Sequence, residues 1–365
     1  ARVCPVGVLC AGACVYNAWG RTPIAIGRLQ RYATEKVMVS GVAGRLLPKA
    51  PANGKTIACV GSGPASLACA GYLALEGCSV TVYEKRAVAG GLNVTGVAPY
   101  KMPAEGGVTE VEFIRSLGVT LRTGVEVGKD VAPEQLLKDN DAVFLGCGLG
   151  ADSALDIPGG EGDGVTGAVA WIERLKLEPG FALAGVRHAV VIGGGNTAID
   201  AARELAQLGV GDVTMLYRRT EADMSGYAHE LEHARAEGVH LVERATPAVF
   251  VREGGKLKAI RLADSREFPC ELAVVAIGQG SLGSLAQSFP GVKADAKGQV
   301  QAEPGTGRTA NPKLWVGGDA RGPDGVGCGE LVVTAVQDGK RAARSIARAL
   351  GLAERDDAPL RAGAE

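Results

Sequence analysis

A pattern of strand, glycine-rich turn, helix and second strand occurs twice in this chain of 365 residues, and it limits the fold more than any other feature. In the first copy, the apolar run TIACV at 56–60 predicts a buried strand. The turn GSGPAS follows, with Gly61 and Gly63 in the first two positions of G-x-G-x-x-G and Ser66 in the third. Gly61 permits the tight turn, and Gly63 lets a pyrophosphate approach the amides of the helix N-terminus.

An acidic residue completes this first fingerprint. A helical stretch from about Ala65 to Glu76 leads to the strand SVTVYE, which ends at Glu84. Roughly 20 residues after the first glycine, a carboxylate can accept hydrogen bonds from a ribose 2′-hydroxyl. The first copy therefore predicts a site for an adenosine with a free 2′-hydroxyl, against the alternative of a glycine-rich turn in some other α/β domain.

The second copy differs where its second strand ends. The strand HAVVI is followed by Gly193, Gly195 and Ala198 in a G-x-G-x-x-A turn, then by a helix and the strand VTMLY. Arg218 and Arg219 come directly after this strand, where the first copy has its acid. Guanidinium groups bind a 2′-phosphate, whereas an acid repels it, so the arginines indicate NADPH. A solvated strand end is the alternative reading of the two arginines.

Two dinucleotide-binding folds in one chain indicate a flavoprotein that exchanges hydride with a pyridine nucleotide. The strands AVFLGCGLG (142–150) and LAVVAIGQG (272–280) end in glycines, as at the exits of nucleotide-binding domains. Asp319 follows the strand LWVGG, where its carboxylate can bond the ribityl or pyrophosphate region of a flavin cofactor. A helix is expected to begin near Glu330, with its positive end against the pyrimidine edge of the isoalloxazine.

We therefore expect an α/β fold with two Rossmann-like dinucleotide-binding domains, for FAD and NADPH, the second inserted in the first. The predicted FAD-binding domain covers 52–180 and 287–350, and the predicted NAD(P)H-binding domain covers 181–286. Residues 1–50 precede both domains, and a polar tail at 353–365 is expected to be frayed.

Composition argues against several other classes of protein. The net charge of −1 and the aromatic content of 4% oppose a nucleic-acid partner or a charged membrane surface. No apolar run approaches the roughly 18 residues of a membrane span. The nine cysteines include no C-x-x-C pair, so we expect neither a secreted disulfide framework nor a dithiol–disulfide reductase, and we predict a cytoplasmic protein. The opening fits neither a signal peptide nor a lipoprotein site, and a start without Met suggests a fragment or a processed product.

The stretch HELEH is a literal H-E-x-x-H motif. On a helix, His229 and His233 share a face and can hold zinc with Glu230 as the base, and Glu253 is a conceivable third ligand. The stretch lies inside the predicted nucleotide domain, and its acids and bases alternate. A solvated helix face is therefore favoured over a zinc peptidase.

From Ala1 to about Leu350 the chain resembles the NADPH- and FAD-binding subunit of bacterial dihydropyrimidine dehydrogenases, and it is also similar to the small subunit of glutamate synthase. The matching stretches are ARVCP, PIAIGRLQRYAT, VGSGPAS, YEKRAVAGGL, GGGNTAID, VTMLYRR and GGDARG with DGKRAA. The resemblance implies that electrons from NADPH pass through FAD and iron–sulfur clusters to an FMN- and iron–sulfur-containing partner subunit that reduces uracil or thymine, in a hetero-oligomer. A glutamate-synthase-type subunit and a scaffold that binds no nucleotide are the alternatives.

The resemblance also gives the N-terminal cysteines a role. In this family a helical domain carries two [4Fe–4S] clusters, and Cys4, Cys10 and Cys14 match its second ligand run, C-x5-C-x3-C. Gln30 matches a glutamine ligand where the glutamate synthase branch usually has Glu. By this resemblance Cys4, Cys10 and Gln30 bind one cluster and Cys14 completes the other. The first cysteine run of the family is absent from the chain, so either the chain is a fragment or the clusters are lost and residues 1–50 are a remnant.

The motifs and the resemblance together give two sets of cofactor residues. Hydride passes between aligned cofactors, so no catalytic Ser, His or Cys is expected. The FAD set is Gly61, Gly63, Pro64, Ala65, Ser66, Glu84, Lys85, Gly90, Gly91, Leu92, Lys101, Val127, Gly318, Asp319, Glu330, Leu331 and Val332. The NADPH set is Gly193, Gly194, Gly195, Asn196, Thr197, Arg218, Arg219, Ser225, Ala276, Ile277 and Gly278.

Overall fold

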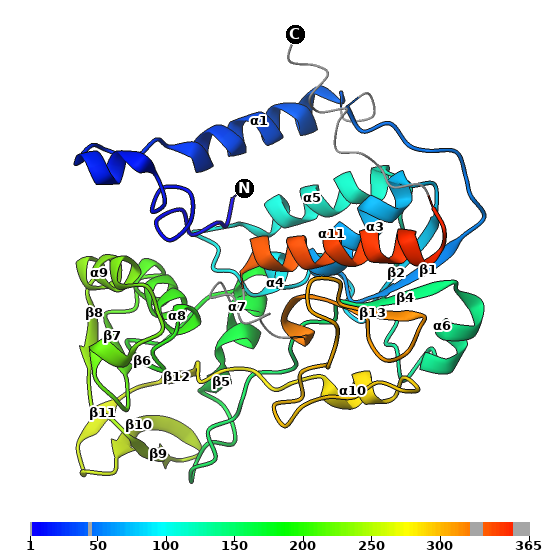
Figure 1. Cartoon of the computed structure of the whole chain (residues 1–365). Helices are drawn as coiled ribbons and strands as arrows, with labels where there is room; N and C mark the ends of the chain where they lie inside the picture. Colours follow the sequence, from blue (N-terminus) through cyan, green and yellow to red (C-terminus); the bar gives the residue numbers. More distant parts are fainter. Residues whose placement is uncertain (1, 43–45, 322–330, 353–365) are drawn as a thin grey trace. The chain divides into compact units, whose positions relative to one another are not determined.

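The computed structural model describes residues 2–42, 46–321 and 331–352 (Figure 1). The chain divides into two compact units. The first unit comprises Ala1–Gly91, Glu105–Leu149 and Ser281–Glu365, and the second comprises Leu92–Ala104 and Gly150–Gly280. The second unit is therefore inserted in the first, as the two fingerprints predict.

The first unit is built on a five-stranded parallel sheet with the strand order β13-β4-β1-β2-β3. Its strands are β1 (Thr56–Val60), β2 (Ser79–Glu84), β3 (Thr120–Thr123), β4 (Ala142–Leu145) and β13 (Leu314–Val316). Strand β4 is buried along its whole length, and β1 is buried from its second residue onward. Continuous apolar runs of this kind are typical of parallel strands that helices cover on both faces.

Several helices belong to the first unit, and two of them pack closely on each other. Helices α3 and α11 run side by side (Figure 1), and a Cβ at Gly339 of α11 would lie only 2.0 Å from the Ala65 carbonyl oxygen of α3. The helices are α1 (Ile26–Ser40), α3 (Pro64–Leu75), α5 (Ala104–Ser116), α6 (Pro133–Asp139), α10 (Gly283–Gln287) and α11 (Val332–Ala349), with the 3₁₀ helices η1 (Val15–Trp19) and η3 (Gly318–Ala320). Neither η1 nor α1 contains a buried residue.

The second unit has its own five-stranded parallel sheet, with the order β5-β12-β6-β7-β8. Its strands are β5 (Val165–Gly167), β6 (His188–Ile192), β7 (Asp212–Leu216), β8 (Val239–Val242) and β12 (Leu272–Val275). Its helices are α4 (Leu92–Thr95), α7 (Ala168–Leu177), α8 (Asn196–Gln207) and α9 (Ala228–Ala236), with the 3₁₀ helix η2 (Glu221–Asp223). An antiparallel sheet of three strands adds β9 (Pro247–Glu253), β10 (Lys256–Leu262) and β11 (Glu267–Pro269).

The boundaries between the units differ from the expected ones. Residues 151–180, assigned above to the FAD-binding domain, pack in the second unit because β5 pairs in parallel with β12. Residues Leu92–Ala104 also belong to the second unit. The polar tail at 353–365 lies outside the described residues. Among the described helices, none combines the length and the apolar character that crossing a bilayer requires.

Candidate nucleotide sites

The first glycine turn joins β1 to α3 and has little room around Gly61. Gly61 has a φ of +85°, and a Cβ there would lie 2.8 Å from both the Cys147 Cα and the Gly146 carbonyl oxygen. Gly63 has an ordinary φ of −69° as the N-cap of α3, and a Cβ there would meet only the Gly146 oxygen at 3.8 Å. Glycine is thus needed at 61 by the protein itself, whereas the space at 63 is open for a ligand.

The buried carboxylate of Glu84 fixes this turn against the end of β2. Glu84 is 6% exposed, and its Oε2 accepts hydrogen bonds from the Ser62 N–H at 3.0 Å and the Ser62 hydroxyl at 2.6 Å. Its Oε1 accepts from the Arg86 N–H at 2.8 Å. An ionised carboxylate offers about four acceptor positions, so one remains for a ribose hydroxyl.

A second loop of the predicted FAD set reaches the same turn. The Gly90 N–H donates to the Ser62 hydroxyl oxygen at 2.9 Å, and a Cβ at Gly91 would lie 2.6 Å from the Gly63 Cα. The structure therefore brings Gly61, Gly63, Glu84, Gly90 and Gly91 together in the first unit. An open cradle at a helix N-terminus and a buried acid with spare acceptor capacity fit the pyrophosphate and adenosine of FAD.

The other predicted FAD residues are spread over several elements. Pro64, Ala65 and Ser66 form the first turn of α3, Lys85 is exposed after β2, and Val127 is buried. Gly318 and Asp319 lie in η3, and the Gly318 N–H donates to Asp338 Oδ2 of α11 at 3.1 Å. Leu331 is the N-cap of α11 and Val332 its first residue, whereas Glu330 lies outside the described residues.

The second glycine turn joins β6 to α8 and repeats the geometry of the first. Gly193 has a φ of +144°, and a Cβ there would lie 2.2 Å from the Ala276 carbonyl oxygen. A Cβ at Gly194 would meet the Tyr217 ring at 2.5 Å. At Gly195 a Cβ would meet only the Ser225 hydroxyl, at 3.5 Å. As in the first turn, the glycine in the second position of the G-x-G motif, here Gly195, faces open space.

The segment after β7 folds back over this turn. The Gly226 N–H donates to the Gly194 carbonyl at 3.0 Å, and the Tyr227 N–H donates to Asn196 Oδ1 at 2.9 Å. The Tyr217 hydroxyl donates to the Asp223 carbonyl at 2.8 Å. These bonds place Ser225 beside the turn, and its predicted role along the NADPH path stays a prediction. Thr197 is exposed in the first turn of α8, and Ile277 and Gly278 are exposed after β12.

Arg218 and Arg219 are both exposed, two and three residues after the end of β7. The Arg219 guanidinium lies 5.7 Å from the centre of the Tyr217 ring, whose edge lines the turn at Gly194. Within the described part of the chain, Arg218 makes no ion pair or side-chain hydrogen bond. Both cations are therefore available to an anionic ligand at this strand end.

Comparison with known families decides the classification. The family model described as pyridine nucleotide-disulphide oxidoreductase matches residues 55–339. The chain belongs to this family. A second model, described as dihydropyrimidine dehydrogenase domain II, 4Fe-4S cluster, matches residues 1–42.

Curated relatives of this oxidoreductase are longer than the chain. The NAD-dependent dihydropyrimidine dehydrogenase subunit PreT of Escherichia coli K12 is 32% identical, with 95% of this chain and 80% of PreT covered. The glutamate synthase [NADPH] small chain of E. coli K12 is 31% identical, with 94% and 79% covered. The chain spans about half the length of two other relatives: 57% of the putative oxidoreductase AegA of E. coli K12 and 48% of the NADP(+)-dependent formate dehydrogenase subunit beta of Moorella thermoacetica.

Solved structures confirm the fold of this oxidoreductase at low sequence identity. FprA of Mycobacterium tuberculosis in complex with NADPH gives a TM-score of 0.64 at 20% identity, covering 85% of this chain and 89% of FprA. Thioredoxin reductase of T. acidophilum gives 0.63 at 20% identity, covering 80% and 98%. The predicted α/β fold with two dinucleotide-binding domains is thus confirmed.

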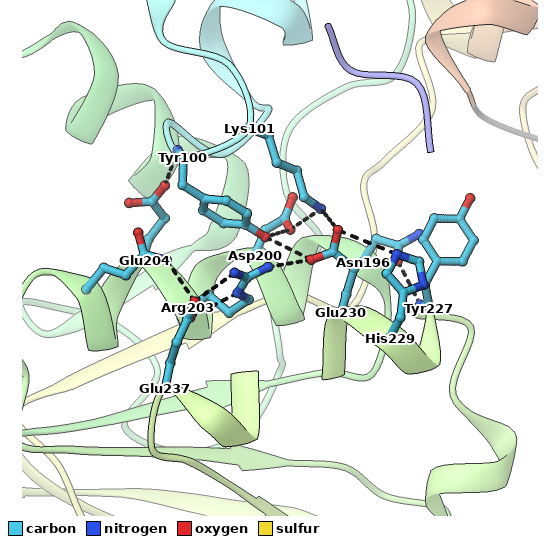
Figure 2. A network of polar contacts seen from close by, with 11 residues as sticks. Tyr100, Lys101, Asn196, Asp200, Arg203, Glu204, Tyr227, His229, Glu230 and Glu237 are labelled. Atoms are coloured by element: carbon cyan, nitrogen blue, oxygen red, sulfur yellow. Dashed lines mark hydrogen bonds and ion pairs between the residues drawn. The ribbon is translucent and has the colours of Figure 1, made fainter. Parts of the chain in front are cut away.

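A polar network that the sequence analysis missed lies in the second unit of the oxidoreductase (Figure 2). The Lys101 Nζ lies 2.6 Å from Asp200 Oδ1 and 3.1 Å from Glu230 Oε1. The Tyr100 hydroxyl donates to the same Asp200 oxygen at 2.7 Å, and the Arg203 guanidinium lies 4.2 Å from the centre of the Tyr100 ring. Lys101, predicted along the flavin, therefore has its ammonium group engaged with two carboxylates of this unit.

Arg203 connects the network to α9. Its Nη1 lies 2.5 Å from Glu230 Oε2, and its Nε and Nη2 donate to the two oxygens of Glu237 at 2.9 and 2.7 Å. Burial raises the pKa of Glu230, but Lys101 and Arg203 outweigh burial and the net pKa is lowered. Glu230 of the H-E-x-x-H stretch is thus an ion-pair partner rather than a free base. His229 stacks on Tyr227, with ring centres 5.7 Å apart.

Glu204 is the member of the network from which we expect a pH-dependent effect. It is 5% exposed, and burial raises its pKa, with a further contribution from Asp200, although the Tyr100 N–H donates to its Oε1 at 2.8 Å. Because the folded-state pKa is the higher one, the ionised form costs stability above the ordinary value of 4.5. Glu204→Gln keeps the acceptor and removes the charge, so we expect its Tm to exceed wild type by a few degrees at pH 7. This advantage should vanish below about pH 4.5 in thermal melts.

A matched variant checks that this effect belongs to the buried charge. Glu253 is exposed in the same unit, so Glu253→Gln removes the same charge from the surface and should leave Tm nearly unchanged at both pH values. A Glu204→Gln protein less stable than wild type at pH 7 would contradict the role assigned to burial.

The set of Cys4, Cys10 and Gln30 assigned to one iron–sulfur cluster contains only two cysteines and stays a prediction. Cys4, Cys10 and Cys14 are partly buried free thiols, and Gln30 is exposed on α1. Among the described residues, no group of three or more His, Cys, Asp or Glu side chains is assembled to hold a metal ion. A [4Fe–4S] cluster takes four ligands, so the residues described here do not fit one by themselves.

Proposed function

We propose that the chain is an FAD-dependent oxidoreductase subunit that takes hydride from NADPH and passes electrons to a partner. The asymmetry between the two turns carries this proposal. The first has the buried Glu84 at the end of its second strand, and the second has the exposed pair Arg218 and Arg219. An acid suits an adenosine ribose with free hydroxyls, as in FAD, and two guanidinium groups suit the 2′-phosphate of NADPH.

Hydride transfer from a nicotinamide to a flavin requires that the two rings be aligned more than it requires acid–base side chains. When bound, the isoalloxazine of FAD accepts hydride from a nicotinamide. The residues of this chain hold the two nucleotides: Gly63 and the N-terminus of α3 for the FAD pyrophosphate, and Gly195 and the N-terminus of α8 for that of NADPH. No catalytic Ser, His or Cys is proposed.

For the partner, we propose a subunit with FMN and iron–sulfur clusters that reduces uracil or thymine in a cytoplasmic hetero-oligomer. The match of residues 1–42 to the dihydropyrimidine dehydrogenase model and the similarity to PreT support this choice. The alternative partner is the one that a glutamate synthase small chain serves, supported by 31% identity to that chain. Gln30, where that branch usually has Glu, favours the first partner.

The test is the visible spectrum of the purified 365-residue chain before and after anaerobic NADPH. We expect flavin bands that bleach with NADPH, without the broad absorbance of iron–sulfur clusters. A colourless protein that stays free of flavin when FAD is added would contradict the proposal and favour a scaffold. Brown protein would mean that clusters assemble on the chain despite the missing ligands.

A further inference from the structure

Arg244 follows β8 and lies beside the two arginines that follow β7 in the second unit. Strands β7 and β8 pair in parallel, with Leu216 opposite Val242. Their hydrogen bonds continue beyond the strand ends, where the Arg244 N–H donates to the Arg219 carbonyl at 3.0 Å. Ligands of parallel α/β sheets bind outside the carboxyl ends of the strands. Arg244 therefore joins Arg218 and Arg219 at the end of the sheet where a nucleotide is expected.

The backbone of Arg244 has a conformation that arginine rarely adopts. Its φ is +50°, in the left-handed region, and the residue is exposed. Within the ranges that the structure describes, Ser265 at a φ of +71° is the other non-glycine residue with a positive φ, and it lies in the turn between β10 and β11. A side chain in this region costs stability that glycine avoids, and such positions are frequent at ligand sites. Strain together with exposure favours a function of the Arg244 side chain in binding.

The carboxylates of the neighbouring segment take their hydrogen bonds from other groups than the arginines at the strand ends. Arg235 Nη1 donates to Glu221 Oε1 at 3.0 Å. Asp223 Oδ2 accepts from the Thr220 N–H at 3.1 Å and from its hydroxyl at 2.6 Å. Glu243 Oε1 accepts from the Glu221 N–H. These acids are thus held by the η2 segment and by α9.

A phosphate monoester is the anion that suits three guanidinium groups. It carries about two negative charges at neutral pH and has three strong acceptor oxygens, and a guanidinium donates to such oxygens with two N–H groups at once. Three like charges at one end of a sheet repel one another, and an anionic ligand removes that repulsion. The proposed function places the 2′-phosphate of NADPH at this end of the sheet.

We propose that Arg244 is a third residue that recognises the 2′-phosphate of NADPH, together with Arg218 and Arg219. This inference rests on the proposed NADPH site. It makes Arg244 a specificity-determining residue that the dinucleotide fingerprint does not mark, because the fingerprint ends with β7 and Arg244 follows the next strand.

The test measures the Kd for NADP⁺ and NAD⁺ by calorimetric titration of the full chain, with Arg244→Gly as the variant. The oxidised coenzymes bind without transferring hydride. Glycine removes the guanidinium and adopts a φ of +50° freely, so the variant should melt at or above the wild-type Tm. Its Kd for NADP⁺ should rise about tenfold, through loss of one charge-assisted hydrogen bond. Its Kd for NAD⁺ should change by no more than about twofold.

Three further variants separate recognition from strain and from net charge. Arg244→Asn should reproduce the effect of glycine, since asparagine also tolerates this backbone region. Ser265→Gly relieves the same kind of strain in the same unit and should change neither Kd. Arg187→Ala removes an exposed cation just before β6, at the opposite end of the parallel sheet, and should affect both coenzymes slightly and equally.

The outcomes separate this inference from the function on which it rests. Wild-type protein that binds NADP⁺ no more tightly than NAD⁺ overturns the proposed NADPH site, and the role of Arg244 with it. Wild-type protein that prefers NADP⁺, with both Arg244 variants keeping that preference, overturns the inference alone. Equal weakening of the two coenzymes would show an effect of net charge and also overturn it. Melting of both Arg244 variants well below wild type would do the same, by showing a structural role.

Discussion

Replacing Gly63 by alanine is expected to remove FAD while leaving the fold intact. Gly63 has a φ of −69°, which alanine adopts without strain, and a Cβ there has only the Gly146 oxygen at 3.8 Å as a neighbour. The added methyl group would fill the space through which the pyrophosphate reaches the N–H groups of α3. Losing two or more charge-assisted hydrogen bonds should raise the FAD Kd at least about 100-fold, measured by fluorescence titration of deflavinated protein.

Two other glycines provide the controls. Gly61→Ala puts a Cβ 2.8 Å from the Cys147 Cα at a φ of +85°, so we expect loss of FAD together with a lower Tm. Gly211→Ala adds the same methyl group to an exposed loop of the second unit, with the Arg187 carbonyl oxygen at 3.5 Å, and should change neither property. A Gly63→Ala protein that folds and holds FAD as tightly as wild type would show that the pyrophosphate lies elsewhere.

The elements of the two glycine turns could be predicted because local sequence determines them. The predicted strands at 56–60 and 188–192 match β1 and β6, and the helix expected from about Ala65 to Glu76 is α3 at Pro64–Leu75. Glycines at fixed spacing after a short apolar run leave few alternatives. The boundary between the domains was harder to predict from the sequence. Strand β5 consists of Val165–Gly167, three residues that form no apolar run. Only its pairing with β12 assigns it to the second unit.

The polar network escaped prediction because its members are far apart in the chain. Tyr100 and Lys101 meet Asp200 and Glu230 only after the second unit has folded. A partial signal was present: Asp200, Arg203 and Glu204 are charged at spacings that put them on one face of α8, and all three are buried. Charged residues on the buried face of a helix require partners, although the sequence does not say which ones.

The proposed preference for NADPH over NADH rests on two side chains, so the double variant Arg218→Ala with Arg219→Ala is expected to give a large and selective effect. Both arginines are exposed, so their loss should leave Tm nearly unchanged. Each charge-assisted hydrogen bond to a 2′-phosphate contributes roughly 1.5–3 kcal/mol, so losing one from each arginine should raise the Kd for NADPH about 100-fold or more. NADH has no 2′-phosphate, and its Kd should change by no more than about threefold.

Net charge alone would weaken both anionic coenzymes, and a second double variant separates that effect from direct recognition. Arg261 and Arg266 lie in the same unit and pair on the surface with Glu267 at 3.0 Å and Asp264 at 2.8 Å. Replacing both by alanine removes the same two charges away from the turn, and should affect both coenzymes slightly and equally. Equal weakening of NADPH and NADH by loss of Arg218 and Arg219 would contradict direct recognition of the phosphate. It would leave the two cations as a solvated strand end.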